Sequence, residues 1–302
     1  CVENDLFRFS SAARALYTWT GIYTEDIDIK FSRKMGTVAW ECLTDTDKRK
    51  EYYESDNPFE IYLSLWAEGC KEIQNTEDVV TPLLNSEKAH RKLLGWYFVL
   101  HIENAEYKHK MALKYIESPE LDDLRVFGLA TDCLYVKRGV TYAFVNRDSK
   151  YEAKPSPDPI YPVTRHERRK LFDKLVPLVE FIGKGKWDFP GYLFPWTDMK
   201  VSNERANVIP CMLSLAAYDL DDYMIEKLHG LMEYMDVDRR SAFYAHLLQP
   251  EKNSLHKEYI LEGIKDKSPS TKEICITKLM NCETEEKDID AIVNMFSTKS
   301  GD

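Results

Sequence analysis

An internal repeat in the last third of the chain is the feature that most constrains its fold. Residues 239–248 (RRSAFYAHLL) align with residues 271–280 (TKEICITKLM) at an offset of 32, and the apolar positions of residues 259–264 fall on residues 291–296 at the same offset. Each period predicts a loop, a helix of about 13 residues, a tight connection and a second helix. Because one such hairpin cannot bury its apolar faces alone, its neighbours must complete the core.

The repeat also predicts which side chains are buried. Leu247 and Leu279 occupy equivalent positions, as do Ile260 and Ile292, so we expect the two members of each pair to be buried alike. Three lysines are expected to face solvent instead: Lys257, Lys272 and Lys287.

Helical periodicity dominates outside the repeat as well. Between residues 57 and 74, apolar side chains recur mostly at helical spacings, and the segment opens with Asn57 and Pro58, a capping residue followed by proline at the first helical position. Further start signals stand at three positions: Thr24, Ser86 and Ser118. Residues 136–145 (VKRGVTYAFV) are rich in β-branched and aromatic side chains, but they sit where a helix is due, so we predict helix there too.

A fainter echo of the repeat is present in the N-terminal half. Residues 91–100 (RKLLGWYFVL) lie over residues 124–133 (LRVFGLATDC) at an offset of 33, and Gly95 matches Gly128. Because glycine has no side chain, these two positions would allow the helix backbone to approach a neighbouring hairpin closely.

These paired helices resemble the HEAT-like family of α-helical repeats, most clearly over residues 203–302 and also over residues 76–147. The sequence lacks the W-x₂-L-G-x₂-Y pattern of tetratricopeptide repeats and the T-P-L-H pattern of ankyrin repeats. The resemblance implies an all-α solenoid, a curved superhelix of stacked antiparallel helix pairs that is used mainly for binding other macromolecules. It implies no catalytic residues.

A proline-rich segment separates two predicted helical arrays. Four prolines between residues 155 and 162 forbid helix within residues 148–163 and favour an extended connector. We therefore predict an N-terminal helical array over residues 1–147 and a C-terminal HEAT-like array over residues 164–302. The first residue is not methionine and the chain stops where another hairpin is due, so we expect a piece of a longer protein. Its last hairpin would then fray or self-associate with another copy.

Two segments after the connector are candidate partner-binding surfaces. Residues 183–200 are broken by prolines and contain five large rings: Trp187, Phe189, Tyr192, Phe194 and Trp196. These rings either pack down to seal the joint between the two arrays or form a contact surface. Residues 165–170 (RHERRK) form a basic run with three arginines: Arg165, Arg168 and Arg169. That run is either a solvated helix face with Glu167 pairing locally or a grip for phosphate or an acidic partner.

Two polar clusters suggest chemistry but have simpler structural explanations. Four potential metal ligands fall at a predicted helix corner and need not share a face: His101, Glu103, Glu106 and His109. Three carboxylates are expected to cap a helix that starts near residue 221: Asp219, Asp221 and Asp222. The sequence also lacks the H-E-x-x-H, glycine-rich phosphate-loop and nucleophile-elbow motifs. We therefore expect neither a metal nor a cofactor.

Cysteine usage and net charge indicate the cellular compartment and the classes of partner. Seven cysteines are scattered without a C-x-x-C pair, which predicts reduced thiols in a cytoplasmic protein. The 41 basic and 51 acidic residues give a net charge of −10, which argues against general nucleic-acid binding. The sequence contains no run of 18 apolar residues, so we predict no membrane-spanning helix.

The sequence therefore predicts a non-catalytic helical scaffold, or a segment of a larger protein, that mediates protein–protein interaction. Two alternatives remain open. One is a nucleic-acid-binding protein of the DNA-repair type, because some HEAT-like proteins cradle DNA on a basic concave face. The other is a regulatory array attached to an enzyme that lies outside this fragment.

Overall fold

The computed structural model describes residues 1–71, 76–135, 164–183, 192–199, 208–283 and 285–297. Across these ranges the regular structure is entirely helical, with fifteen α-helices and no strand. The all-α prediction is therefore confirmed for the part of the chain that is described. The segment 136–145, for which we predicted helix, lies outside it. None of the helices in these ranges combines the length and the apolar character that a bilayer crossing requires.

The chain forms two compact units, and both are discontinuous in sequence. The first unit comprises Cys1–Val136 and Lys186–Ala206, and the second comprises Lys137–Gly185 and Asn207–Asp302. This division differs from the one drawn at the proline-rich connector, because the chain returns to the first unit after α9 (Arg165–Ile182). The connector itself, residues 148–163, lies outside the described ranges.

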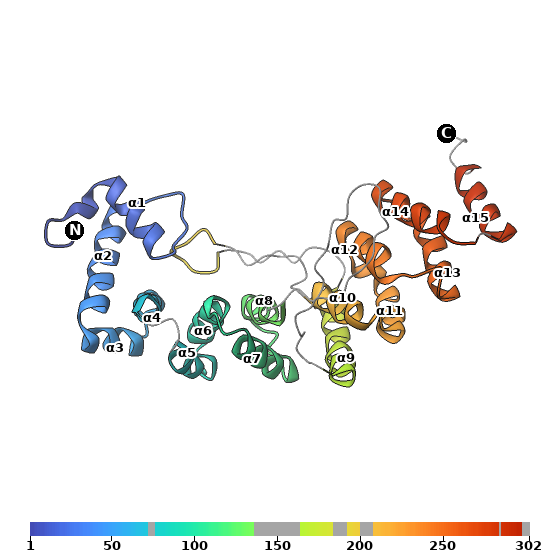
Figure 1. Ribbon diagram of the computed structural model, residues 1–302. Helices are drawn as coiled ribbons and strands as arrows, with labels where there is room; N and C mark the ends of the chain where they lie inside the picture. Colours follow the sequence, from blue (N-terminus) through green and yellow to red (C-terminus); the bar gives the residue numbers. More distant parts are fainter. Residues whose placement is uncertain (72–75, 136–163, 184–191, 200–207, 284, 298–302) are drawn as a thin grey trace. The chain divides into compact units, whose positions relative to one another are not determined.

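Eight α-helices build the described part of the first unit. They are α1 (Ser10–Trp19), α2 (Ile29–Thr44), α3 (Thr46–Glu54), α4 (Pro58–Lys71), α5 (Thr76–Leu84), α6 (Ala89–His101), α7 (Ala105–Glu117) and α8 (Leu124–Asp132). α2 packs against α1, α3 and α4, while α6 packs against α4, α5 and α8. The core therefore runs between helices that are close in sequence (Figure 1).

The start of α4 is the one that the sequence placed correctly in this unit. Asn57 Oδ1 accepts a hydrogen bond from the Phe59 amide at 3.1 Å, and Pro58 occupies the first helical position. Proline costs nothing there, because the first-turn amide that it lacks would have no partner within the helix.

The other three predicted starts are wrong. α2 begins five residues after Thr24, because the Asp28 carboxylate caps its first amides. α8 begins six residues after Ser118, because the Asp123 carboxylate caps it. α6 begins three residues after Ser86, at Ala89, and has no side-chain cap. In the first two cases an aspartate nearer the apolar run supplies the acceptor that the hydroxyl was expected to supply.

Residues 192–199 are tied to the first unit by the turn that follows α1. Thr197 Oγ1 and the Asp198 amide both donate to the Tyr23 carbonyl, each at 2.7 Å. The Glu25 amide in turn donates to Asp198 Oδ2 at 2.6 Å. Figure 1 shows this segment in yellow beside the blue N-terminal helices. These bonds explain why the segment belongs to the first unit, although more than 170 residues separate the partners in sequence.

The described part of the second unit contains the remaining seven α-helices. They are α9, α10 (Val208–Asp219), α11 (Asp222–His229), α12 (Val237–Ala242), α13 (Ser254–Gly263), α14 (Pro269–Met280) and α15 (Glu286–Ser297). α12 continues as a π-helical turn, η5 (Phe243–Leu247). α11, α13 and α15 begin at Asp222, Ser254 and Glu286, and α12 and α14 begin at Val237 and Pro269. Both sets are spaced at the offset of 32 that the sequence shows.

The repeat predicts two pairs of positions that should be buried alike, and the structure agrees for one pair only. Leu247 and Leu279 are both buried, as predicted. Ile260 is also buried, but its equivalent Ile292 is only half-buried. The two isoleucines are therefore not alike.

One side of α15 remains apolar and open. Ile289 is 51% exposed and Val293 is 56% exposed. The other side is anchored, because Lys257 Nζ lies 2.5 Å from Oδ2 of the fully buried Asp288.

The prediction that Lys257 faces solvent is wrong because this lysine pairs with Asp288, and a buried carboxylate needs a cationic partner. Lys272 is half-buried, and the side chain of Lys287 lies outside the described part.

Close packing between α13 and α14 gives a testable prediction. A Cβ added at Gly263 would lie 2.5 Å from Cys275 Sγ and 2.6 Å from Tyr244 Cε1. We expect Gly263→Ala to lower the free energy of unfolding by about 1–3 kcal/mol, measured by urea denaturation. Gly69→Ala in α4 is the control, since its Cβ would meet nothing within 4 Å. It should be neutral or stabilising by up to about 1 kcal/mol. Equal stability of the two variants would contradict the close packing.

Candidate functional site

A cavity of about 540 Å³ in the first unit is the candidate binding site. The turn after α1, one face of α4, the start of α5 and the end of α6 line it. Six aromatic side chains face it: Trp19, Tyr23, Tyr62, Trp66, Tyr97 and Phe98. This site is termed the aromatic groove. Its volume falls in the range of about 300–1,000 Å³ that is usual for ligand pockets.

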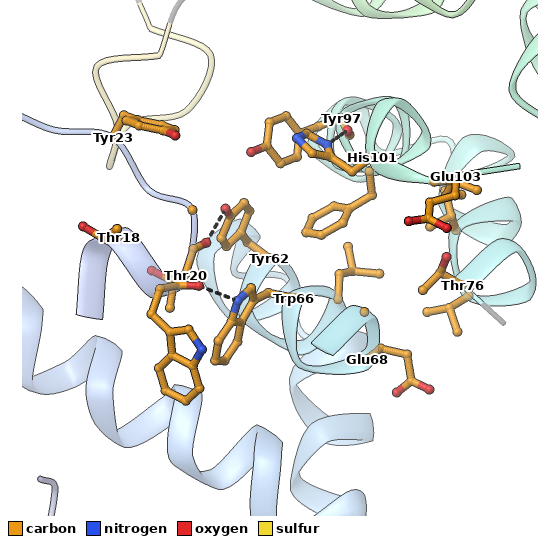
Figure 2. Close-up of a pocket in the computed structure, with 18 residues that line it drawn as sticks. Thr18, Thr20, Tyr23, Tyr62, Trp66, Glu68, Thr76, Tyr97, His101 and Glu103 are labelled. Carbon is orange, nitrogen blue, oxygen red and sulfur yellow. Dashed lines mark hydrogen bonds between the residues drawn. The ribbon is translucent and has the colours of Figure 1, made fainter. Parts of the chain in front are cut away.

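Hydrogen bonds from α4 hold the turn that forms one wall of the groove. The Tyr62 hydroxyl donates to the Thr20 carbonyl at 2.8 Å, and Trp66 Nε1 donates to the Trp19 carbonyl at 3.0 Å (Figure 2). Gly21 follows with φ +71°, a conformation that glycine adopts without strain. The wall is therefore fixed by two large side chains that also supply the floor.

The rings divide into a buried floor and an exposed mouth. Tyr62, Trp66 and Tyr97 are all buried. Trp19 is 59% exposed and Tyr23 is 72% exposed. Trp19 meets Trp66 edge to face, with ring centroids 4.9 Å apart. Two large rings at the opening of the cavity are therefore exposed to solvent.

The two ends of the aromatic groove differ in chemistry. Figure 2 shows Tyr23 at one end, Tyr62 and Trp66 in the middle, and Glu68 and Glu103 at the other end. Glu68 Oε2 lies 2.9 Å from Arg49 Nε, and that arginine does not line the groove. No lysine or arginine is among the described residues that line it. The groove therefore combines aromatic faces with negative charge.

The titratable rings of the groove serve structural roles. Burial raises the pKa of Tyr62 and of Tyr97, so both phenols stay neutral at physiological pH. His101 Nδ1 lies 2.8 Å from the Tyr97 carbonyl, and its ring lies 4.6 Å from the Tyr97 ring. The N–H of that nitrogen can donate to this carbonyl. The arrangement holds the rings in place.

Residues 192–199 support the floor of the groove from outside. Phe194 and Trp196 stack in parallel with centroids 5.0 Å apart. Phe194 lies 5.4 Å from the Tyr97 ring, and Trp196 lies 6.1 Å from the Tyr62 ring. Of the five rings singled out in the sequence, Phe194 is buried, Trp196 is half-buried and Tyr192 is 49% exposed. Trp187 and Phe189 lie outside the described residues.

Residues 1–302 match the family described as "Family of unknown function (DUF5724)". The chain belongs to this family. No curated protein and no solved structure matches it.

The basic run of α9 is engaged with the corner between α10 and α11. Arg165 Nε lies 2.6 Å from Asp221 Oδ2, and Arg169 Nη2 lies 2.8 Å from Asp221 Oδ1. Arg168 is buried and pairs with Asp219. All three arginines therefore bind carboxylates of the second unit itself, which weakens the case for a phosphate grip.

Asp221 also confirms its predicted role as a helix cap. Its Oδ1 accepts a hydrogen bond from the Tyr223 amide at 3.1 Å, at the start of α11. Glu167 closes a capping box with Thr164 at the start of α9, so this acid acts within its own helix turn. Both interactions stabilise helix termini.

The polar clusters give no sign of a metal centre. Among the described residues, no group of three histidine, cysteine, aspartate or glutamate side chains is placed to hold a metal ion. His109 is buried, and burial lowers its pKa to about 4, so it stays neutral. Burial raises the pKa of the Cys42, Cys211 and Cys275 thiols to about 12, so these cysteines stay protonated and act as packing groups.

Sequence reasoning missed the aromatic groove. Tyr62 and Trp66 fit the apolar helical period of α4, which predicts core residues at both positions. Trp19 and Tyr23 flank Gly21 just after a helix end, which is the one local signal that they lie in an exposed turn. Nothing in the spacing shows that this turn folds over α4.

Proposed function

We propose that this chain is a non-catalytic helical scaffold that binds a protein partner through the aromatic groove. The observation that carries the proposal is the exposure of Trp19 and Tyr23 at the mouth of a cavity of about 540 Å³. Tryptophan and tyrosine dominate the residues that contribute most to protein–protein binding, since they bury large areas at little conformational cost. A wall and floor fixed by the hydrogen bonds that Tyr62 and Trp66 donate would lower the cost of ordering on binding.

The scaffold part of the proposal is a HEAT-like superhelix of stacked antiparallel helix pairs. The constant offset between equivalent helix starts in the second unit supports it. So does the packing between periods, because α12 contacts α14 and α13 contacts α15. In a stacked array each helix packs on its equivalent in the next repeat.

We also propose that the protein works in the cytoplasm. Six cysteines in the described part of the chain are free, four of them buried. A scattered set of free thiols is typical of a reducing compartment.

A peptide-display selection against the whole chain tests the binding proposal. We expect peptides that bind the wild-type protein and lose about 10- to 30-fold in affinity on Trp19→Ala, because the variant removes a large exposed ring from the mouth of the groove. Tryptophan fluorescence titration gives the dissociation constants. Trp40→Ala is the matched control, since Trp40 is 51% exposed but does not line the groove, and it should leave binding unchanged.

Two results would overturn this function. One is a selection that yields no binder. The other is a set of binders that tolerate Trp19→Ala and Tyr23→Ala but fail on Trp40→Ala, which would place the binding surface on α2 instead. Circular dichroism of each variant would confirm that the helices remain folded.

A further inference from the structure

We propose that the partner segment enters the aromatic groove with a cationic side chain, arginine or lysine. This inference rests on the proposed function and specifies the chemistry that the groove selects. Its basis is the set of described side chains that line the cavity, in which aromatic faces and carboxylates occur together and cationic groups are lacking.

The charge of the lining is one-sided. Glu68 and Glu103 contribute two carboxylates, and the described lining includes no lysine or arginine. Arg49 neutralises part of the Glu68 charge from outside the groove. Glu103 is exposed, and no ion pair involves it in the described part of the chain. An incoming cation would therefore meet an unneutralised carboxylate at this end of the groove.

The rings favour the same class of ligand. Aromatic faces attract a guanidinium or ammonium group through their quadrupole, and the attraction grows as water is excluded. Trp66 lies between Tyr23 and the two glutamates in Figure 2, and Trp19 meets it edge to face. A side chain lying in the groove would therefore meet aromatic rings as well as the carboxylate of Glu103. Arginine and lysine combine a long apolar stem, which suits the rings, with a charged end, which suits the carboxylate.

Neutral ligands that stack on rings, such as an apolar peptide side chain, fit the lining less well. They would bury Glu103 next to an uncharged group, and a carboxylate desolvated without a partner costs free energy. The same carboxylates disfavour an anionic ligand by repulsion. A cationic side chain is the class that satisfies both ends of the groove.

Peptides recovered from the display selection provide the test. We expect them to share an arginine or a lysine. Replacing that arginine by citrulline, which keeps the shape and removes the charge, should weaken binding to the wild-type protein about 10-fold. For a lysine peptide, acetylation of the lysine serves the same purpose. Higher salt should weaken the arginine peptide more than the citrulline peptide.

Glu103→Gln locates the charge recognition. This variant should weaken the arginine peptide about threefold or more, and it should reduce the penalty for citrulline. Glu106→Gln is the matched control, because Glu106 is exposed nearby in the sequence but does not line the groove. It should bind both peptides as the wild type does.

The outcomes separate this inference from the proposed function. Binders that need Trp19 but accept citrulline without loss would overturn the cationic inference and leave the binding function standing. A citrulline penalty that Glu103→Gln leaves unchanged and Glu106→Gln abolishes would place the charge contact outside the groove and overturn the inference as well. Absence of any Trp19-dependent binder would overturn both.

Discussion

Leu279→Ala is expected to lower the free energy of unfolding by about 2–5 kcal/mol. Leu279 is 1% exposed and lies on α14, which packs against α12, α13 and η5. Truncation removes buried apolar surface and leaves a cavity among three neighbours that cannot all close in on it. Urea denaturation followed by circular dichroism gives the free energy, and amide exchange in α14 reports the second unit separately.

The adjacent residue is the matched control for this prediction. Met280 occupies the next position of α14 but is 79% exposed, so Met280→Ala should change stability by no more than about 0.5 kcal/mol. The contrast between two neighbours tests the phase of the helix directly. If Leu279→Ala were as mild as Met280→Ala, the burial pattern predicted from the internal repeat would be wrong.

The all-helical character was predictable because it depends on residues that are close together in the sequence. Apolar side chains recur at helical spacing, and Asn57 and Pro58 mark a start directly before the first buried ring of α4, Phe59. The exact starts were less predictable where two acceptors compete. Thr24 and Asp28 both precede the same helix, and the carboxylate that lies next to the apolar run provides the cap. Sequence order does not reveal which acceptor is used.

The discontinuous first unit could not be predicted. The bonds that hold it together join the Tyr23 carbonyl to Thr197 and Asp198. Every residue has a backbone carbonyl, so the sequence does not indicate which one accepts these bonds. The same applies to the aromatic groove. Trp66 looks like a core residue in its own helix, and the exposure of Trp19 depends on how the turn after α1 settles on α4.

The arginine run and the acidic corner were each recognised in the sequence, but their pairing was not. About fifty residues separate Arg169 from Asp221, and each cluster has a sufficient local explanation of its own. What brings them together is the packing of α9 against α10. Opposite charge at two helix termini was the available signal, and the resulting ion pairs carry the second large prediction.

Asp221→Ala should lower the free energy of unfolding by about 3 kcal/mol at neutral pH, because it removes the cap of α11 and the charged hydrogen bonds from Arg165 and Arg169. Burial would raise the pKa of Asp221, but the bonds from these arginines outweigh it and lower the pKa to about 2. The pKa of an aspartate in an unfolded chain is about 4. The stability that Asp221 contributes is therefore complete above about pH 4 and is lost as pH falls toward about 2.

The pH dependence distinguishes this ion-pair cluster from a general loss of packing. The wild-type protein should lose its advantage over Asp221→Ala between about pH 4 and pH 2, as denaturation at a series of pH values would show. Asp238→Asn is the control, because Asp238 is exposed, lies in the same unit and forms no ion pair in the described structure, so it should follow the wild type throughout. A difference between wild type and Asp221→Ala that stays constant down to pH 2 would mean that the charge of Asp221 contributes nothing. The interpretation of Asp221, Arg165 and Arg169 as a stabilising ion-pair cluster would then be wrong.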